Sequence, residues 1–273
     1  MKKKLKLGGV IAIAIVFSLI VVITAMCIRP VNIKTISHRG YSSVAPENTI
    51  IAFEKSSERG YKFVECDVEF TKDGVAVLLH DESIKRTSNA TEDINVRELT
   101  FEEIRKYDFG YPDKFKDEFK GEKIPTFEEF ISLCKERDLH PYIELKSQGG
   151  NYAYTEENVK SLIDIVEKYN LTVTYISFNY SLLEMVKKFD AFARLGYVKN
   201  KITNEVVSQT LALKTGKNEV FLNVNYGYLT NKKVELVKSK GIPLEVWTIN
   251  EEIIVKFLHP YISGVTTDKL IFN

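Results

Sequence analysis

Short apolar or β-branched runs alternate with amphipathic helical patterns along residues 31–273, and this alternation constrains the fold more than any other feature of the sequence. It is typical of βα units, which build a parallel sheet covered by helices. We expect strands near residues 33–37, 63–68, 142–145, 173–178, 193–198, 220–224, 244–249 and 265–267. We expect helices at residues 126–133, 158–169, 182–189 and 230–239. Eight strands of this kind predict a closed α/β barrel.

A further strand-like run, residues 75–79, follows Phe70 after the glycine-containing segment 71–74, which is suited to a hairpin turn. A hairpin partner runs antiparallel, so this run is not a member of an all-parallel barrel. We expect it to be a return arm above the barrel mouth. The arm would bring His80 back toward the end of the strand at residues 63–68.

A long insertion, residues 82–123, follows this arm and contains one helical pattern, at residues 100–107. Long insertions in compact domains are usually functional or mobile. We expect this one to cover the barrel mouth and to help select a substrate.

The N-terminal 30 residues differ from the rest of the chain. Four lysines come first, at positions 2, 3, 4 and 6, and an uncharged run occupies residues 7 to 28, which is 22 residues. As a helix, this run would span roughly 33 Å, close to the hydrocarbon thickness of a bilayer. The alternative is a signal peptide, whose apolar region is shorter and ends in an A-x-A-like site that residues 24–27 do not offer.

We therefore expect an uncleaved single-pass anchor in the cell membrane. The lysines precede the apolar run, so the positive-inside tendency places the N-terminus in the cytoplasm. Residues 31–273 would then form one domain outside the membrane.

The charge balance argues against a nucleic-acid partner. Residues 1–29 hold five of the 38 Lys and Arg residues and none of the 37 Asp and Glu residues, so the remainder carries 33 − 37 = −4. Nucleic-acid binding calls for a clustered basic surface, which this balance disfavours.

The outward domain has two cysteines, Cys66 and Cys134, too few for a disulfide framework. Cys66 alternates with two carboxylates on a strand, so we expect a buried free thiol that faces the helices. A single bridge to Cys134 is the alternative.

Charged side chains gather at the ends of two predicted strands. Glu65 and Asp67 are two residues apart on an extended segment and project from the same face, and Glu144 and Lys146 repeat this spacing on another strand. An all-oxygen set of Glu65, Asp67 and Glu144 suits Mg²⁺ or Ca²⁺. Arg39 and Lys146 add phosphate-binding cations. The structural alternative is a Glu144–Lys146 ion pair that closes the barrel.

Two histidines, His38 and His80, lie at the ends of their predicted strands near this acidic rim. At such a rim, one histidine can accept a proton from a nucleophile while the other protonates a leaving oxygen. We interpret His140 and His259 as structural.

These residues belong to a series of short motifs that follow one another along the chain. The series contains Ser37-His38-Arg39-Gly40, Pro46-Glu47-Asn48-Thr49, Glu65-Cys66-Asp67-Val68, His80-Asp81, Ile143-Glu144-Leu145-Lys146, Trp247-Thr248-Ile249-Asn250 and Thr267-Asp268, with further matches at residues 71–74, 124–129 and 177–178. It resembles the motif series of glycerophosphodiester phosphodiesterases and covers essentially all of residues 33–270. One such motif is weak evidence, whereas the whole series in order is strong evidence.

The resemblance implies a TIM barrel of the phospholipase C-like phosphodiesterase type, one divalent cation (Ca²⁺ or Mg²⁺), and a role in lipid and glycerol metabolism. The reaction would hydrolyse a small glycerophosphodiester to sn-glycerol 3-phosphate and an alcohol. The resemblance makes His38 and His80 the general acid and base and Glu65, Asp67 and Glu144 the metal ligands. Arg39 and Lys146 would hold the phosphate.

Three further residues carry two interpretations each. Glu47 and Asn48 would brace the site or cap a helix that begins near Thr49, and capping is the role we favour for Asn48. Trp247 would line the substrate pocket or fill the interior layer of the barrel.

Two other functions compete with this one. One is a phospholipase D-like activity on lysophospholipids or sphingomyelin, for which a membrane anchor would give access to lipid. The other is a non-catalytic surface module that binds phosphodiester polymers. Loss of a histidine or a carboxylate would favour the module, and the sequence retains them all.

Overall fold

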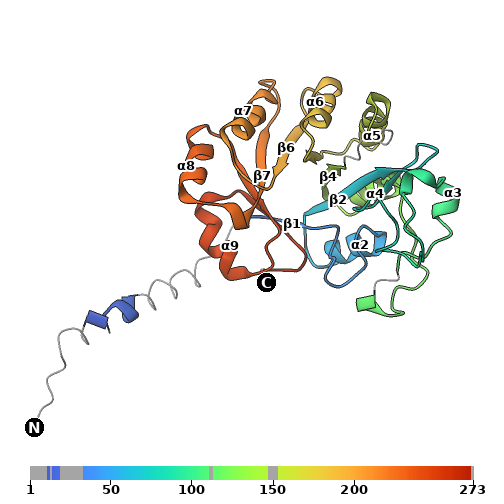
Figure 1. Cartoon of the computed structure of the whole chain (residues 1–273), viewed down its shortest axis with the longest axis horizontal. Coiled ribbons are helices and arrows are strands. Elements are labelled where there is room, and N and C mark those ends of the chain that lie inside the picture. Colours follow the sequence, from blue (N-terminus) through green and yellow to red (C-terminus); the bar gives the residue numbers. More distant parts are fainter. Residues whose placement is uncertain (1–10, 13, 19–32, 111–112, 147–152, 272–273) are drawn as a thin grey trace, which may run out of the picture.

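Figure 1 shows the computed structural model of the chain, which describes residues 11–12, 14–18, 33–110, 113–146 and 153–271. The run predicted to be a membrane anchor, residues 7–28, lies largely outside these ranges. Within them, no helix is both long enough and apolar enough to cross a membrane.

Eight parallel strands close into a barrel, as the alternation of strands and helices predicted (Figure 1). The strands are β1 (Lys34–Ser37), β2 (Phe63–Phe70), β4 (His140–Leu145), β5 (Thr174–Ser177), β6 (Arg194–Lys199), β7 (Val220–Asn225), β8 (Leu244–Trp247) and β9 (Gly264–Thr267). They pair in sequence order, and β1 closes the ring by pairing with both β9 and β2. The TIM-barrel prediction is confirmed.

The predicted hairpin arm is also present. Strand β3 (Ala76–Leu78) pairs antiparallel with β2, with Val68 opposite Leu78. Gly74 in the turn has a φ of 81°, a left-handed conformation that glycine adopts without steric cost. The arm therefore places His80 beside the carboxyl end of β2.

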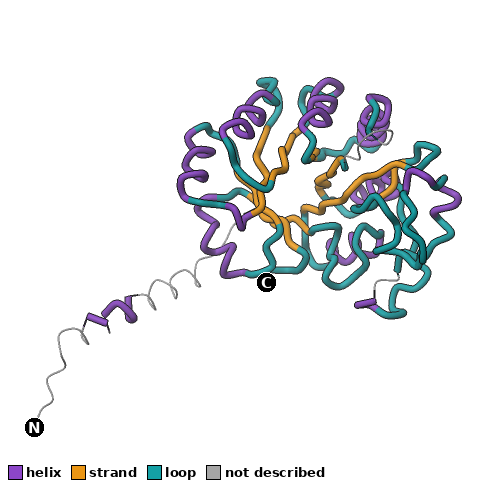
Figure 2. Tube along the Cα trace, viewed as in Figure 1, coloured by secondary structure: helices purple, strands orange, loops and turns teal. Residues whose placement is uncertain are grey.

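Helices surround the barrel (Figure 2). They are α2 (Ile50–Glu58), α4 (Phe127–Glu136), α5 (Glu156–Lys168), α6 (Tyr180–Phe189), α7 (Asn204–Ala212), α8 (Asn231–Ser239) and α9 (Glu252–Leu258). The four helices predicted from amphipathic patterns are present as α4, α5, α6 and α8. The sequence analysis did not predict α7 and α9.

Strand alternation separates two cores. On β2, Val64, Cys66 and Val68 pack against the helices, whereas Glu65 and Asp67 project from the other face into the barrel. Inside the barrel a second cluster fills the space beneath the mouth, formed by Ile36, Tyr142, Ile176, Val198 and Phe221. The charged rim therefore rests on a packed apolar layer.

Gly196 on β6 makes room for the ring of Phe221 on β7. A Cβ atom at position 196 would lie 2.2 Å from Phe221 Cζ. Interior layers of small barrels are filled by side chains of alternating size, which explains the need for a residue without a side chain here.

Cys66 is a buried free thiol, as expected. Cys134 is also buried and free, so the alternative disulfide is not formed. Burial raises the pKa of each thiol well above its usual value. Neither cysteine is therefore a reactive thiolate at neutral pH.

The described part of the insertion, residues 82–110 and 113–123, forms a small lobe beside the barrel, at α3 in Figure 1. It contains α3 (Phe101–Ile104) and two short 3-10 turns, Val96–Glu98 and Asp113–Phe115. A core of its own joins it to the β3 arm, made by Val77, Leu79, Ile84, Val96, Ile104, Phe109 and Ile124. The lobe also reaches the β1–α2 loop, where Lys114 Nζ donates to the Ser42 carbonyl at 2.6 Å. A covering role over the mouth stays a prediction.

Candidate active site

A cavity of about 280 Å³ opens at the carboxyl ends of the barrel strands. This is the end of a parallel barrel where catalytic groups gather. The predicted site residues that line it are His38, Arg39, Glu65, His80, Glu144, Lys146 and Trp247. The topology thus brings together residues that are up to 209 positions apart (247 − 38).

Three carboxylates form a tight cluster in this site. Glu65, Asp67 and Glu144 each present an oxygen within 4.8 Å of the others, because the pairing of β2 with β4 places Asp67 beside Glu144. Burial raises the pKa of Glu65 well above its usual value, and the charges of Asp67 and Glu144 raise it further. Burial would also raise the pKa of Asp67, but Lys146 and Arg39 outweigh it and lower that pKa. Asp67 therefore stays ionised.

The cluster fits a divalent cation. Glu65 Oε1 and Asp67 Oδ1 are buried and accept no hydrogen bond among the described residues. Buried carboxylate oxygens are costly unless they accept hydrogen bonds, pair with a cation or coordinate a metal. Because all the donors are oxygens, the cation class that suits them is a hard ion.

The Glu144–Lys146 ion pair of the structural alternative is present, with Lys146 Nζ 2.9 Å from Glu144 Oε1. Lys146 Nζ also lies 3.4 Å from Asp67 Oδ1. This pair leaves Glu65 Oε1 without a partner, so a structural ion pair alone does not satisfy the cluster.

Arg39 connects the loop after β1 to the acidic cluster. Its backbone N–H donates to Glu65 Oε2 at 2.9 Å, and its Nε lies 3.3 Å from Asp67 Oδ2. Its Nη1 donates to Glu47 Oε1 at 2.7 Å. Glu47 thus braces the site through Arg39. Burial would raise the pKa of Glu47, but the hydrogen bonds and charges of Arg86 and Arg39 outweigh it and lower that pKa.

Our prediction that Asn48 caps α2 is wrong. Thr49 is the N-cap, and its side chain accepts from Ala52 N–H. Asn48 has a φ of 56°, which turns its amide toward β2. There it donates to Asp67 Oδ2 at 2.9 Å and accepts from Asp67 N–H at 3.2 Å. Asn48 therefore braces a predicted metal ligand, because the adjacent threonine already serves the helix terminus.

Each of the two histidines is held by an aspartate. His38 Nδ1 lies 2.7 Å from Asp268 Oδ1, and His80 Nδ1 lies 2.6 Å from Asp81 Oδ1. Burial raises the pKa of Asp268, but the hydrogen bond and charge of His38 outweigh it and lower the pKa to about 2. The hydrogen bond from His80 is the main cause that lowers the pKa of Asp81.

An ionised carboxylate only accepts hydrogen bonds, so the Nδ1 atom of each ring carries the proton. The Nε2 atoms have no hydrogen-bond partner among the described residues. They are the nitrogens available to a substrate.

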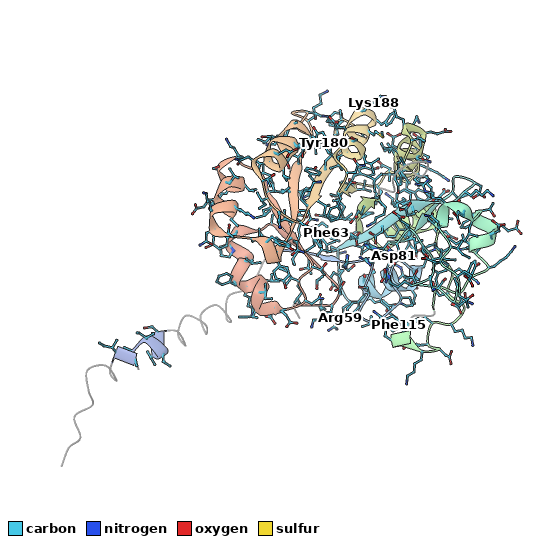
Figure 3. All side chains as sticks on the ribbon, viewed as in Figure 1. Arg59, Phe63, Asp81, Phe115, Tyr180 and Lys188 are labelled. Atoms are coloured by element: carbon cyan, nitrogen blue, oxygen red, sulfur yellow. The ribbon has the colours of Figure 1, made fainter. Side chains whose placement is uncertain are left out.

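The sequence analysis assigned no role to Asp81, Asp268 or Asn250. Asn250 Nδ2 donates to Asp268 Oδ2 at 2.7 Å and fixes that carboxylate. The signals were present, because all three residues belong to the motifs quoted above. Arg86 contacts both Asp81 and Glu47, and no motif of the sequence analysis included it. Figure 3 labels Asp81, which lies between the barrel and the insertion in this view.

Trp247 fulfils both interpretations. Its ring packs against the interior cluster of the barrel and also lines the cavity. It meets Phe178 edge to face, with 5.6 Å between the ring centroids. With Ile176 and Val198, these rings form the apolar wall of the cavity.

The two histidines predicted to be structural do not line the cavity. His140 begins β4 at the opposite end of the barrel, where its Nε2 lies 2.9 Å from Thr174 Oγ1. Burial, with Arg194 and Lys34 nearby, lowers the pKa of His140 to about 4. His259 begins the 3-10 turn His259–Tyr261 after α9.

A parallel barrel whose mouth combines buried carboxylates, two aspartate-held histidines and two cations belongs to the class of hydrolases that act on phosphate esters. The model of the glycerophosphoryl diester phosphodiesterase family matches residues 38–271. The chain belongs to this family.

Relatives and solved structures agree with this assignment. A glycerophosphodiester phosphodiesterase of Caldanaerobacter subterraneus is 35% identical over 236 residues, which are 85% of this chain and 93% of that protein. One from Bacillus subtilis is 30% identical over 88% of this chain and 85% of its own length. An Oleispira antarctica phosphodiesterase, solved with the product sn-glycerol-3-phosphate, has a TM-score of 0.77 and 26% identity, with 86% of this chain and 92% of that chain covered. The Thermotoga maritima glycerophosphodiester phosphodiesterase has a TM-score of 0.67 and 28% identity, with 88% and 96% covered.

Proposed function

We propose that this protein hydrolyses glycerophosphodiesters to sn-glycerol 3-phosphate and an alcohol. The observation that supports this most is the meeting, at one end of the barrel, of a cluster of three carboxylates, two of them buried, and two aspartate-held histidines. The product complex of the Oleispira antarctica relative supports the same reaction.

The two histidines divide the proton transfers. One Nε2 accepts a proton from the nucleophile, and the other donates a proton to the oxygen of the departing alcohol. Asp268 and Asp81 keep both rings in the tautomer and orientation that present these atoms. Arg39 and Lys146 bind the phosphate oxygens from the charged wall of the cavity.

Glu65, Asp67 and Glu144 would hold one divalent cation, Ca²⁺ or Mg²⁺, which would neutralise phosphate charge and polarise the P–O bonds when bound. The apolar wall around Trp247 and Phe178 contacts the carbon skeleton of the substrate. The alcohol would leave through the open mouth.

The decisive assay uses the purified full chain with a panel of substrates, each with and without chelator. The panel contains glycerophosphocholine, glycerophosphoethanolamine, lysophosphatidylcholine, sphingomyelin and a glycerol phosphate polymer. Release of glycerol 3-phosphate from the first two, abolished by EDTA and restored by Ca²⁺ or Mg²⁺, supports the proposal. Turnover of only the lysophospholipid or sphingomyelin identifies the phospholipase D-like alternative, and binding of the polymer without turnover identifies the non-catalytic one.

Variants of the two histidines test the division of roles. His38→Ala and His80→Ala should each lower kcat by about 10² to 10⁴-fold while the fold persists. A p-nitrophenyl phosphodiester has a leaving group that needs little protonation, so it should rescue whichever variant lacks the acid. Near wild-type kcat on glycerophosphocholine in either variant contradicts the two-histidine mechanism.

The membrane location is a separate proposal, supported by the 22-residue uncharged run after the four lysines. The full chain should fractionate with membranes and resist high salt, whereas residues 31–273 expressed alone should not sediment with them. A mature protein that begins after residue 27 would show a cleaved signal peptide instead.

A further inference from the structure

Arg86, in the insertion, makes an unusual set of contacts next to the site. Its Nε donates to Asp81 Oδ2 at 2.5 Å, and its Nη2 donates to Asp81 Oδ1 at 3.1 Å. Its Nη1 and Nη2 donate to Glu47 Oε2 and Oε1, both at 2.8 Å. One guanidinium therefore forms bidentate hydrogen bonds to two carboxylates, a geometry that lysine cannot reproduce.

The two carboxylates belong to different halves of the site. Asp81 accepts the hydrogen bond from His80 Nδ1, so it belongs to the proton-transfer half. Glu47 accepts from Arg39, whose Nε lies beside Asp67, so it belongs to the phosphate and metal half. Among the described residues, Arg86 is the side chain that bonds to both carboxylates.

Asp81 needs such an anchor. It directly follows the histidine that it orients, on the loop after the short strand β3, so the strand itself does not fix its carboxylate. Glu47 lies on the separate loop between β1 and α2. Both loops bond to Asp67 of β2, through the Leu79 N–H and through Asn48, but these bonds do not reach the Asp81 and Glu47 carboxylates, which Arg86 joins directly.

A purely stabilising role explains this arrangement less well. The Arg86 side chain is 48% exposed, and exposed ion pairs contribute little to stability. A displacement of about 1 Å at a catalytic group, by contrast, costs on the order of 10²-fold in rate. The contacts of Arg86 therefore matter more for geometry than for folding.

We propose that Arg86 is the positioning residue that holds Asp81 and Glu47 in register, so that His80 and Arg39 act on the same phosphodiester. This rests on the proposed function of the site. It also gives the insertion a defined part in catalysis, because the insertion supplies the residue that links the hairpin arm to the phosphate-binding loop.

The test begins with Arg86→Ala in the full chain, assayed on glycerophosphocholine with metal saturating. We expect kcat to fall by about 10²-fold, with a smaller change in KM, because His80 loses its orientation while the cavity keeps its shape. Arg105→Ala is the matched control. Arg105 belongs to the same insertion, but it pairs with Glu129 at 3.3 Å and with the Ile124 carbonyl, away from the cavity, and its removal should leave kcat unchanged.

Chemical rescue separates positioning from folding. The Arg86 side chain is 48% exposed, so the alanine variant is open to solvent at this position. Free guanidinium ion should restore part of the lost rate, because its planar donors can form the same bidentate contacts with both carboxylates. Ammonium ion at the same ionic strength should not, and Arg86→Lys should recover little activity for the same reason. Neither salt should change the rate of wild type or of Asp81→Asn.

A double-mutant cycle gives a second measurement. Arg86→Ala combined with Asp81→Asn should cost clearly less than the product of the two single effects, because both changes act on His80. Arg86→Ala within twofold of wild type overturns the proposal, as does a loss that guanidinium does not restore in a variant with wild-type melting temperature and circular dichroism. A wild-type protein inactive on the whole panel contradicts the proposed function instead.

Discussion

Asp268→Asn is the sharpest single perturbation of the site, because it preserves shape and changes one hydrogen-bonding role. Asp268 Oδ1 faces His38 Nδ1, and Oδ2 accepts from Asn250 Nδ2 at 2.7 Å. An amide at position 268 must keep its oxygen toward Asn250, since two NH₂ groups would otherwise face each other. Its own NH₂ group then points at His38 Nδ1. That nitrogen has to become an acceptor, and the ring proton moves to Nε2.

The expected effect on rate is large. With Nε2 protonated, neutral His38 no longer accepts a proton from the nucleophile. The loss should match that of general base catalysis, about 10² to 10⁴-fold in kcat. If His38 is instead the acid, the variant loses the aspartate that stabilises its charged form, and the p-nitrophenyl substrate should then recover most of the rate.

The expected effect on stability is small. The pKa of Asp268 falls from 3.8 to about 2, which corresponds to about 2.4 kcal/mol at about 1.4 kcal/mol per pKa unit. The side chain is 37% exposed, so solvent screening reduces this to about 1 kcal/mol. Because the folded pKa is depressed, the contribution is fully present above pH 3.8 and is lost as the pH falls through about 2. At pH 7 the melting temperature should therefore drop by about 2 to 4 °C.

Steady-state kinetics on glycerophosphocholine and differential scanning calorimetry measure the two effects on the same preparation. Asp164→Asn is the control, because Asp164 pairs with Lys160 on the exposed face of α5, far from the cavity in the fold. A kcat within threefold of wild type for Asp268→Asn, with normal metal content, refutes the tautomer argument. A melting temperature lowered by more than about 10 °C would show instead that the aspartate is mainly structural.

Three further predictions follow from other parts of the barrel. Gly196→Ala should lower the free energy of unfolding by about 1 to 3 kcal/mol, because its Cβ would meet the Phe221 ring, and urea titration measures this. Burial and the charge of Arg194 lower the pKa of His140 from 6.5 to about 4, so the free energy of unfolding should fall as the pH falls from 6.5 toward 4. His140→Gln should reduce that loss by about 2 kcal/mol at pH 4.5. Urea titrations that give the same pH dependence of the free energy of unfolding for both proteins would contradict this. Excess Ca²⁺ should raise the melting temperature of chelator-treated wild type but not of Asp67→Asn, and equal shifts would argue against the carboxylate cluster as the metal site.

The sequence predicted those features whose cause is local. Alternating strand and helix patterns predicted the barrel, and the turn at Gly74 predicted the antiparallel arm that carries His80. The two-residue spacing of Glu65 and Asp67 predicted that both project from one face. Each of these follows from the period of a strand or from the conformation of a turn, which neighbouring residues determine.

Tertiary structure decided the partners of these residues. Asp268 is 230 positions from His38, and the two meet because the barrel closes by pairing β1 with β9, with Ser37 beside Thr267. Asn48 bonds to Asp67 and does not cap α2, because Thr49 already satisfies the helix and a left-handed backbone turns the amide inward. Arg86 bonds to Glu47, 39 positions away, only because the insertion folds back against the β1–α2 loop. Periodicity determines the face on which a side chain lies, whereas the closing of the barrel and the packing of its loops determine what that side chain meets.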